Sequence, residues 1–245
     1  MAPLARLASA AVEAAAQCDN AAEALGCAEA AARSFTQRAA SACQAAAVHA
    51  AELIHDGSRV LTHSRSSTVF QAFKLAIAAG HRVAVIATES RPLMEGRQLA
   101  AELVRQGATV TLIADADAAS GIERAELVLI GADAVTASRV INKIGTRLIA
   151  LAARELGKPV YVVCDTSKFV GSAEGLLHAR RRQDSAELWL DAPDGLEVLN
   201  AYFEATPLSL FTAVITEDGP ATQEDAARQA EQFTLNGRFL EGIGA

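Results

Sequence analysis

The stretch RVLTHSRSSTVFQAFKLAIAAGHRVAVIAT, residues Arg59–Thr88, contains the pattern that decides the fold. A short β-branched run, RVLT, is followed by a polar cluster and then by the apolar periodicity of a helix that stops at Gly80. A second β-branched run, RVAVIAT, comes next. Strand, helix and strand with apolar strands predict a parallel pair joined by a right-handed crossover, which is the unit of an α/β fold.

The same alternation continues toward the C-terminus. We expect further strands at TVTLIA, ELVLIG and PVYVVC, and weaker strands at AELWL and LFTAVIT. Helices are predicted at MEGRQLAAELVRQG, NKIGTRLIALAARELG and TQEDAARQAEQF, and the first two close with a glycine. Fully apolar strands are typical of a sheet covered on both faces. The sequence therefore predicts a Rossmann-like parallel sheet with helices on both faces.

The N-terminal part has a different amino-acid composition and does not show this alternation. Residues 1–56 are rich in alanine, the best helix former, and predict a short helical domain of two or three helices with a break and an N-cap at Asp19–Asn20. Residues 57–245 hold the alternating pattern. We therefore expect a helical N-terminal segment at 1–56 and a Rossmann-like domain that binds a sugar phosphate or nucleotide at 57–245.

Composition limits the classes of partner. The chain has 245 residues, of which 51% are hydrophobic and only 4% aromatic, with a formal net charge of −7. Few stacking rings and an acidic balance disfavour nucleic acid, and no apolar run is long enough to cross a membrane. The four cysteines form no C-x-x-C pair and match no zinc spacing. We expect a cytoplasmic protein with free thiols, no metal and no cofactor.

Ligands of open α/β sheets bind at the carboxyl ends of the strands. Arg65, Arg91, Lys143 and Lys168 each follow a different predicted strand, so we expect all four on one rim. Four cations on one edge of an acidic protein indicate a bound anion, such as a small phosphorylated ligand.

Two helix starts carry the same signal. Ser66, Ser67 and Thr68 stand where a helix begins, and free amides with hydroxyls can hold a phosphate there. The alternative is that one serine is a plain N-cap and the others are solvated. Asn142 is a predicted N-cap, and Lys143 in the first turn opposes the helix dipole unless an anion binds beside it.

Candidate acid–base groups lie in the same loops. Asp133 follows the apolar run VLIGA, a common position for a catalytic acid or base, although a capping or turn aspartate is the simpler interpretation. Ser64 has no G-x-S-x-G context and is not expected to be a hydrolase nucleophile. We expect His63 to form local hydrogen bonds and Cys164 to be a structural thiol.

Six motifs occur along the chain: THSRSSTV, TESRPLMEGRQLA, VTLIADADA, GADAVTASRVINKIGT, DTSKF and YFEATPLSLFTAVITEDG. Together they resemble the family of translation initiation factor 2B α, β and δ subunits, which also contains ribose-1,5-bisphosphate isomerase and methylthioribose-1-phosphate isomerase. The resemblance covers about residues 58–219. It implies a Rossmann-like domain after a helical one, and a homodimer or larger homo-oligomer.

The resemblance also implies residue roles. In the isomerases a cysteine after TH accepts a proton and the aspartate of GAD donates one while an aldose phosphate becomes a ketose. Asp133 matches that aspartate, whereas Ser64 stands at the cysteine position. The residues that the resemblance and the loop positions assign to substrate binding are Ser66, Ser67, Thr68, Arg91, Asn142, Lys143 and Lys168.

Three departures from the isomerase pattern are visible. Ser64 replaces the cysteine, and a hydroxyl is a far poorer acid–base group than a thiol near neutral pH. Glu95 stands where isomerases tend to carry glutamine. The start, MAPLARL, resembles a segment well inside the N-terminal domain of relatives, so we expect a shortened domain without the Arg-Gly substrate-binding motif.

Two hypotheses follow. The first, which we favour slightly, is a factor-2B-like protein that binds a phosphorylated sugar or nucleotide with weak or no catalysis. The alternative is an aldose–ketose isomerase, an intramolecular oxidoreductase, acting on a phosphorylated ribose. Ser64 supports the first hypothesis, and the retained Asp133 with the Asn-Lys pair supports the second.

Overall fold

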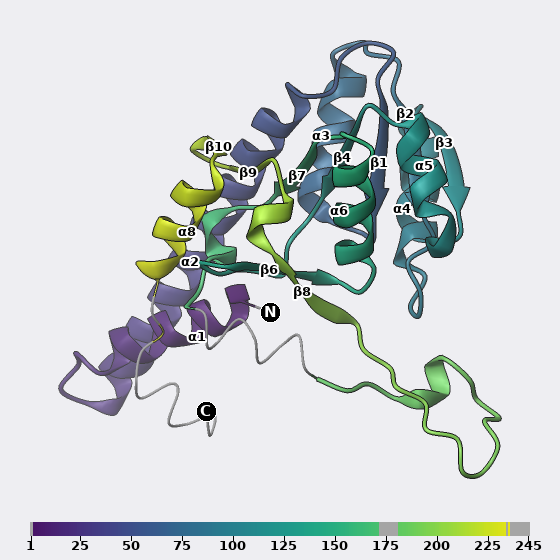
Figure 1. Ribbon diagram of the computed structural model, residues 1–245. Helices are drawn as coiled ribbons and strands as arrows, with labels where there is room; N and C mark the ends of the chain where they lie inside the picture. The colour runs from purple at the N-terminus through teal and green to yellow at the C-terminus, as the bar shows by residue number, and fades with distance from the viewer. Residues whose placement is uncertain (1, 172–180, 234, 236–245) are drawn as a thin grey trace.

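The computed structural model describes residues 2–171, 181–233 and 235. Its centre is a seven-stranded sheet in the order β10-β9-β7-β4-β1-β2-β3 (Figure 1). The strands are β1 Arg59–His63, β2 Ala84–Thr88, β3 Thr109–Ile113, β4 Leu127–Ile130, β7 Val160–Val163, β9 Ala213–Thr216 and β10 Gly219–Ala221. Every neighbouring pair is parallel except β9 with β10. The predicted parallel sheet is confirmed, including the weaker strand at LFTAVIT.

Helices cover both faces of this sheet, as the apolar strands predict. Along β1, Val60 packs into the core under one set of helices and Leu61 into the core under the other. The Val60 face is covered by α2 Ala21–Ala51, α3 Ser67–Ala78 and α4 Glu95–Arg105. The Leu61 face is covered by α5 Ala118–Arg124, α6 Thr146–Glu155 and α8 Gln223–Glu231. The chain therefore changes faces between β1 and β4, which are neighbours in the sheet.

The alanine-rich N-terminus forms a helical hairpin of α1 Ala2–Ala15 and α2. Asn20 is the N-cap of α2, as predicted, and its side chain accepts a hydrogen bond of 3.0 Å from the Glu23 amide. The C-terminal part of α2 packs on α3 and on β9, whereas the hairpin turn points away from the sheet (Figure 1).

A second, antiparallel sheet corrects one prediction. It contains β5 Ala134–Val135, β6 Arg139–Lys143 and β8 Phe203–Pro207. Asn142 is therefore not an N-cap, and Lys143 is not in a first helical turn, because both lie on β6. The helix begins later, at Thr146. Its first amides are capped from β8: Glu204 Oε1 accepts from the amides of Gly145 and Arg147 at 2.7 and 2.9 Å.

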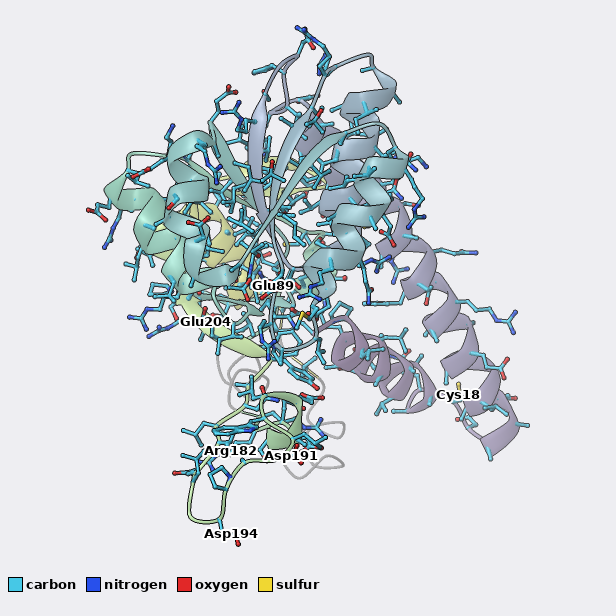
Figure 2. The ribbon with its side chains drawn as sticks, turned by 90° about the vertical axis from the view of Figure 1, so that its right-hand side faces the viewer. Cys18, Glu89, Arg182, Asp191, Asp194 and Glu204 are labelled. Atoms are coloured by element: carbon cyan, nitrogen blue, oxygen red, sulfur yellow. The ribbon has the colours of Figure 1, made fainter. Side chains whose placement is uncertain are left out.

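The predicted strand AELWL is also wrong. That sequence lies in residues 181–200, here called the arm, which projects away from both sheets (Figures 1 and 2). The arm contains one short 3-10 helix, Ser185–Glu187, and no neighbouring strand completes a sheet with it. Trp189 and Leu190 are 52% and 78% exposed there. No helix within the described ranges is both long and apolar enough to span a membrane.

Candidate functional site

A cavity of about 390 Å³ opens at the carboxyl ends of β1, β4 and β7. The chain leaves β1 toward one face of the sheet and β4 toward the other, and ligands of open α/β sheets bind at such a point. The residues that line the cavity are Pro3, Ala39, Cys43, His63, Ser64, Arg65, Ser66, Ser67, Thr68, Gly131, Ala132, Asp133, Asn142, Val163, Cys164, Asp165, Ser167 and Lys168.

The loop after β1 forms one wall of the cavity. Ser64 has a φ of 66°, a strained value for a residue other than glycine, and its amide donates to Ser90 Oγ at 2.7 Å. Ser66 is the N-cap of α3, because its Oγ accepts from the Val69 amide at 3.3 Å. The first turn of α3 therefore lies at the cavity. Its free amides are at the place where the sequence predicts that a phosphate binds.

The end of β4 approaches this wall closely. A Cβ on Gly131 would lie 2.6 Å from both Cβ and Oγ of Ser66. Such a distance is too short for any side chain, so glycine is needed for the β4 loop to pass the start of α3. The passage places Asp133 on the cavity beside the hydroxyl cluster, although the two segments are far apart in sequence.

The loop after β7 supplies a third wall. Asp165 accepts a 3.0 Å hydrogen bond from the amide of Ser167, and Glu217 accepts one of 2.9 Å from the amide of Thr166. These bonds hold Ser167 and Lys168 at the cavity. Ser167 is only 7% exposed, and its Oγ has no hydrogen-bond partner among the described residues. Lys168 has no ion pair within the part of the chain that the structure describes.

The N-terminal helix borders the cavity beside Asp133. The amide of Ala2 donates to the backbone oxygen of Asp133 at 3.3 Å, and Pro3 lines the cavity. Arg6 donates to the backbone oxygen of Thr166, and its guanidinium lies 3.8 Å from the ring centre of Phe233. The sequence did not predict that the start of α1 would reach the candidate site.

His63 is a buried hydrogen-bonding group, as expected, but its partners are distant in sequence rather than local. Its Nε2 lies 2.8 Å from the backbone oxygen of Ile144, and its Nδ1 lies 2.6 Å from Thr88 Oγ1. A carbonyl oxygen can only accept, so Nε2 carries the hydrogen and Nδ1 accepts from the threonine hydroxyl. Burial lowers the pKa of His63, which favours this neutral form.

Two cysteines also line the cavity, although the sequence analysis did not assign them to the site. Cys43 of α2 lies 3.0 Å from Thr68 Oγ1, and Cys164 follows β7. Burial strongly raises the pKa of the Cys164 thiol, so it stays protonated near neutral pH. Lys168 was predicted at the site because it follows a strand, and Cys164, Asp165 and Ser167 follow the same strand, β7. No sequence signal places Cys43 or Pro3, because both come from the helical hairpin.

The structure brings together most of the predicted site residues but not all. Ser64, Ser66, Ser67, Thr68, Asp133, Asn142 and Lys168 line the cavity, and Arg65 does so as well. Arg65 also pairs with Glu102 at 2.9 Å. Lys143 is turned into the protein and pairs with Glu95, and Arg91 is not among the lining residues. The predicted convergence of four cations is therefore reduced to Arg65 and Lys168.

The described residues contain no group of three or more His, Cys, Asp or Glu side chains that could hold a metal ion. The cavity instead combines a helix N-terminus, hydroxyls, an amide and two cations, Arg65 and Lys168, with two carboxyls, Asp133 and Asp165. The pocket lies at the switch point of a Rossmann-like α/β sheet, which is where proteins of this fold class bind their ligands.

The chain belongs to the initiation factor 2 subunit family, whose model matches residues 3–223. It is 37% identical over 206 residues to ribose 1,5-bisphosphate isomerase of Archaeoglobus fulgidus, covering 77% of this chain and 65% of the relative. It is 39% identical over 173 residues to a putative translation initiation factor eIF-2B subunit 2-like protein of Pyrococcus abyssi, covering 69% and 59%.

A solved structure supports the same family. The translation initiation factor eIF-2B of Pyrococcus horikoshii superposes with a TM-score of 0.77 at 31% identity, covering 91% of this chain and 76% of that one. The chain spans 55–65% of the length of the first curated relatives it matches.

Proposed function

We propose that the chain is a factor-2B-like protein that binds a phosphorylated sugar or a nucleotide in the cavity between β1, β4 and β7. One observation carries the proposal: α3 begins at the cavity, and Lys168 reaches the same cavity from the β7 loop. A helix N-terminus and a cation together favour a phosphate group.

The other polar groups fit the sugar part of such a ligand. Asn142 Nδ2 donates to Thr146 Oγ1 at 2.9 Å, which leaves its carbonyl oxygen able to accept from a hydroxyl. Ser167 Oγ is buried and needs a partner, and a bound hydroxyl or phosphate oxygen could supply one. These groups support a ligand that carries both phosphate and hydroxyls.

Thermal unfolding with inorganic phosphate, ribose 5-phosphate and AMP tests the proposal. A ligand that binds only the folded chain stabilises it by about 2.7 kcal/mol at a hundredfold excess over Kd. We expect Lys168→Ala to lose most of the ligand-induced rise in Tm. Lys74→Ala is the matched control, since Lys74 is an exposed lysine of α3. Equal stabilisation of both variants by every ligand contradicts the proposed site.

The second candidate function is aldose–ketose isomerisation of a phosphorylated ribose, and Asp133 favours it. This carboxyl lines the cavity that holds the proposed phosphate site, so it can exchange a proton with a bound sugar. Ser64 occupies the position of the proton-accepting thiol in related isomerases and supplies only a hydroxyl. We therefore rank catalysis below binding. A turnover assay with ribose 1,5-bisphosphate and with methylthioribose 1-phosphate separates the two functions.

The proposal includes self-association into a homodimer or a larger assembly. The arm projects from the body (Figure 2) and exposes the apolar side chains of Trp189, Leu190 and Leu199. Large apolar side chains exposed on one segment often mark a protein–protein interface. A second copy of the chain is the partner that we assign to it.

A further inference from the structure

Two cysteines meet at the far end of the helical hairpin, away from the cavity. Cys18 lies in the turn that follows α1, and Cys27 lies on α2. Figure 2 shows Cys18 at the end of the hairpin that is distant from the sheet. The two Sγ atoms are 2.6 Å apart. A disulfide bond is about 2.05 Å long, so the two sulfurs are already close to bonding distance.

We propose that Cys18 and Cys27 are a modification site, a pair of thiols that forms a reversible disulfide across the α1–α2 hairpin. The other two cysteines have different surroundings. Cys164 is 1% exposed, and Cys43 contacts the hydroxyl of Thr68. Cys18 and Cys27 are both half-buried, so a small oxidant can reach them. The proposal does not depend on the function assigned to the cavity.

The oxidant is a low-molecular-weight disulfide such as oxidised glutathione. The thiolate of one cysteine attacks it and forms a mixed disulfide, releasing one small thiol. The second cysteine then attacks the mixed disulfide and releases the other small thiol. Both cysteines are oxidised and the small disulfide is reduced to two thiols, which take up the two protons. The hydrogen bond to Cys27 raises the pKa of Cys18, so the exchange should be faster at alkaline pH.

The disulfide would act on the wall of the cavity through α1. The opposite end of this helix contacts Asp133 through the amide of Ala2, and it places Pro3 at the cavity. Between these ends α1 packs along α2. A covalent link at the turn restricts the unfolded hairpin and holds α1 on α2, so the oxidised chain should be more stable than the reduced one.

Peptide mapping of the whole chain tests the link. The chain is equilibrated in reduced or in oxidised glutathione and then alkylated. It is then digested with a protease that cleaves on the carboxyl side of glutamate. Cleavage after Glu13, Glu23 and Glu29 separates the two cysteines, so the oxidised sample should contain residues 14–23 joined to residues 24–29. The reduced sample should contain the same two peptides, each alkylated.

Thermal unfolding tests the consequence. Oxidation should raise Tm in the wild type and in Cys43→Ser, which keeps the pair, but not in Cys27→Ser. Separate alkylation of Cys18 and Cys27 in excess oxidised glutathione would overturn the proposal, as would a link from either residue to another cysteine or another chain. If the disulfide between Cys18 and Cys27 forms but Tm does not change, the proposal that it holds α1 on α2 is wrong.

Discussion

Lys143 and Glu95 form a buried ion pair, with Lys143 Nζ 2.5 Å from Glu95 Oε1. The lysine side chain is 3% exposed and the glutamate side chain 23%. Tyr202 and Phe203 cover the ammonium group, with ring centres at 5.2 and 5.5 Å. The pair joins β6 of the small sheet to the start of α4, which is one of the helices that cover the large sheet.

We predict that Lys143→Ala destabilises the fold by about 3–5 kcal/mol, because it leaves the charge of Glu95 buried without a partner. Denaturant unfolding measures this loss. The double variant Lys143→Met with Glu95→Gln should recover a large part of it, since it removes both charges. A loss below about 1 kcal/mol in Lys143→Ala would show that the pair behaves as a surface salt bridge.

Gly131→Ala should damage the site and the fold together. Its Cβ would lie 2.6 Å from Ser66, so the β4 loop and the start of α3 must separate. Such overpacking costs about 1–3 kcal/mol, and phosphate should stabilise the variant less than it stabilises the wild type. Gly26→Ala on α2 is the control: nothing lies within 4 Å of the new Cβ. That change should stabilise the chain by roughly 0.5–1 kcal/mol, since alanine is the better helix former.

Ser64→Cys should create or increase isomerase turnover. A thiol has a reference pKa of about 8.5, which makes it a usable proton acceptor in a cavity that also holds Asp133. General acid–base groups contribute ~10²–10⁴-fold, so the gain should fall in that range when ribose 1,5-bisphosphate is the substrate. The double variant with Asp133→Asn should lose the gain. Robust wild-type turnover that survives Ser64→Ala would place the proton acceptor elsewhere.

His63 should make stability fall in mild acid. Burial lowers its pKa and Lys143 lowers it further, whereas the hydrogen bond to Ile144 and the charges of Asp115 and Glu204 raise it. The unfolded chain therefore binds the proton more readily than the folded chain does. The stabilisation is complete above the unfolded pKa, about 6.5, and is lost as the pH falls toward the lower folded value.

Denaturant unfolding at pH 7.5 and pH 5.5 measures this pH dependence. His63→Gln cannot titrate, so it should show a smaller difference between the two pH values than the wild type, even if it is less stable at both. The same difference in both proteins would assign the pH dependence to other groups.

Leu190→Asp should weaken self-association. Leu190 is 78% exposed on the arm, and burying a leucine side chain contributes about 1.5–3 kcal/mol. Sedimentation analysis should show at least a tenfold weaker dimer. Leu25→Asp on α2, where the leucine is 64% exposed, is the control and should leave the assembly unchanged. A wild-type chain that is monomeric at micromolar concentration would contradict the assembly itself.

The sequence by itself predicted the six parallel strands of the large sheet, the helices that follow most of them and one wall of the cavity. Apolar strands, glycine stops and the hydroxyls at the start of α3 are local signals, and they located Ser66, Asp133 and Lys168 at strand ends that share an edge. Such signals come from propensity and periodicity within one short segment, so no partner segment is needed to interpret them.

Tertiary structure alone decided the position of Lys143, the entry of Cys43 and Pro3 into the cavity, and the contact between Cys18 and Cys27. Asn142 and Lys143 resemble a helix start, but pairing of β6 with β8 makes them a strand, and Glu204 caps the true start of α6. Each of these outcomes depends on a segment distant in sequence. Local propensity is weak compared with the burial and hydrogen bonds that such pairing supplies, so tertiary contacts override it.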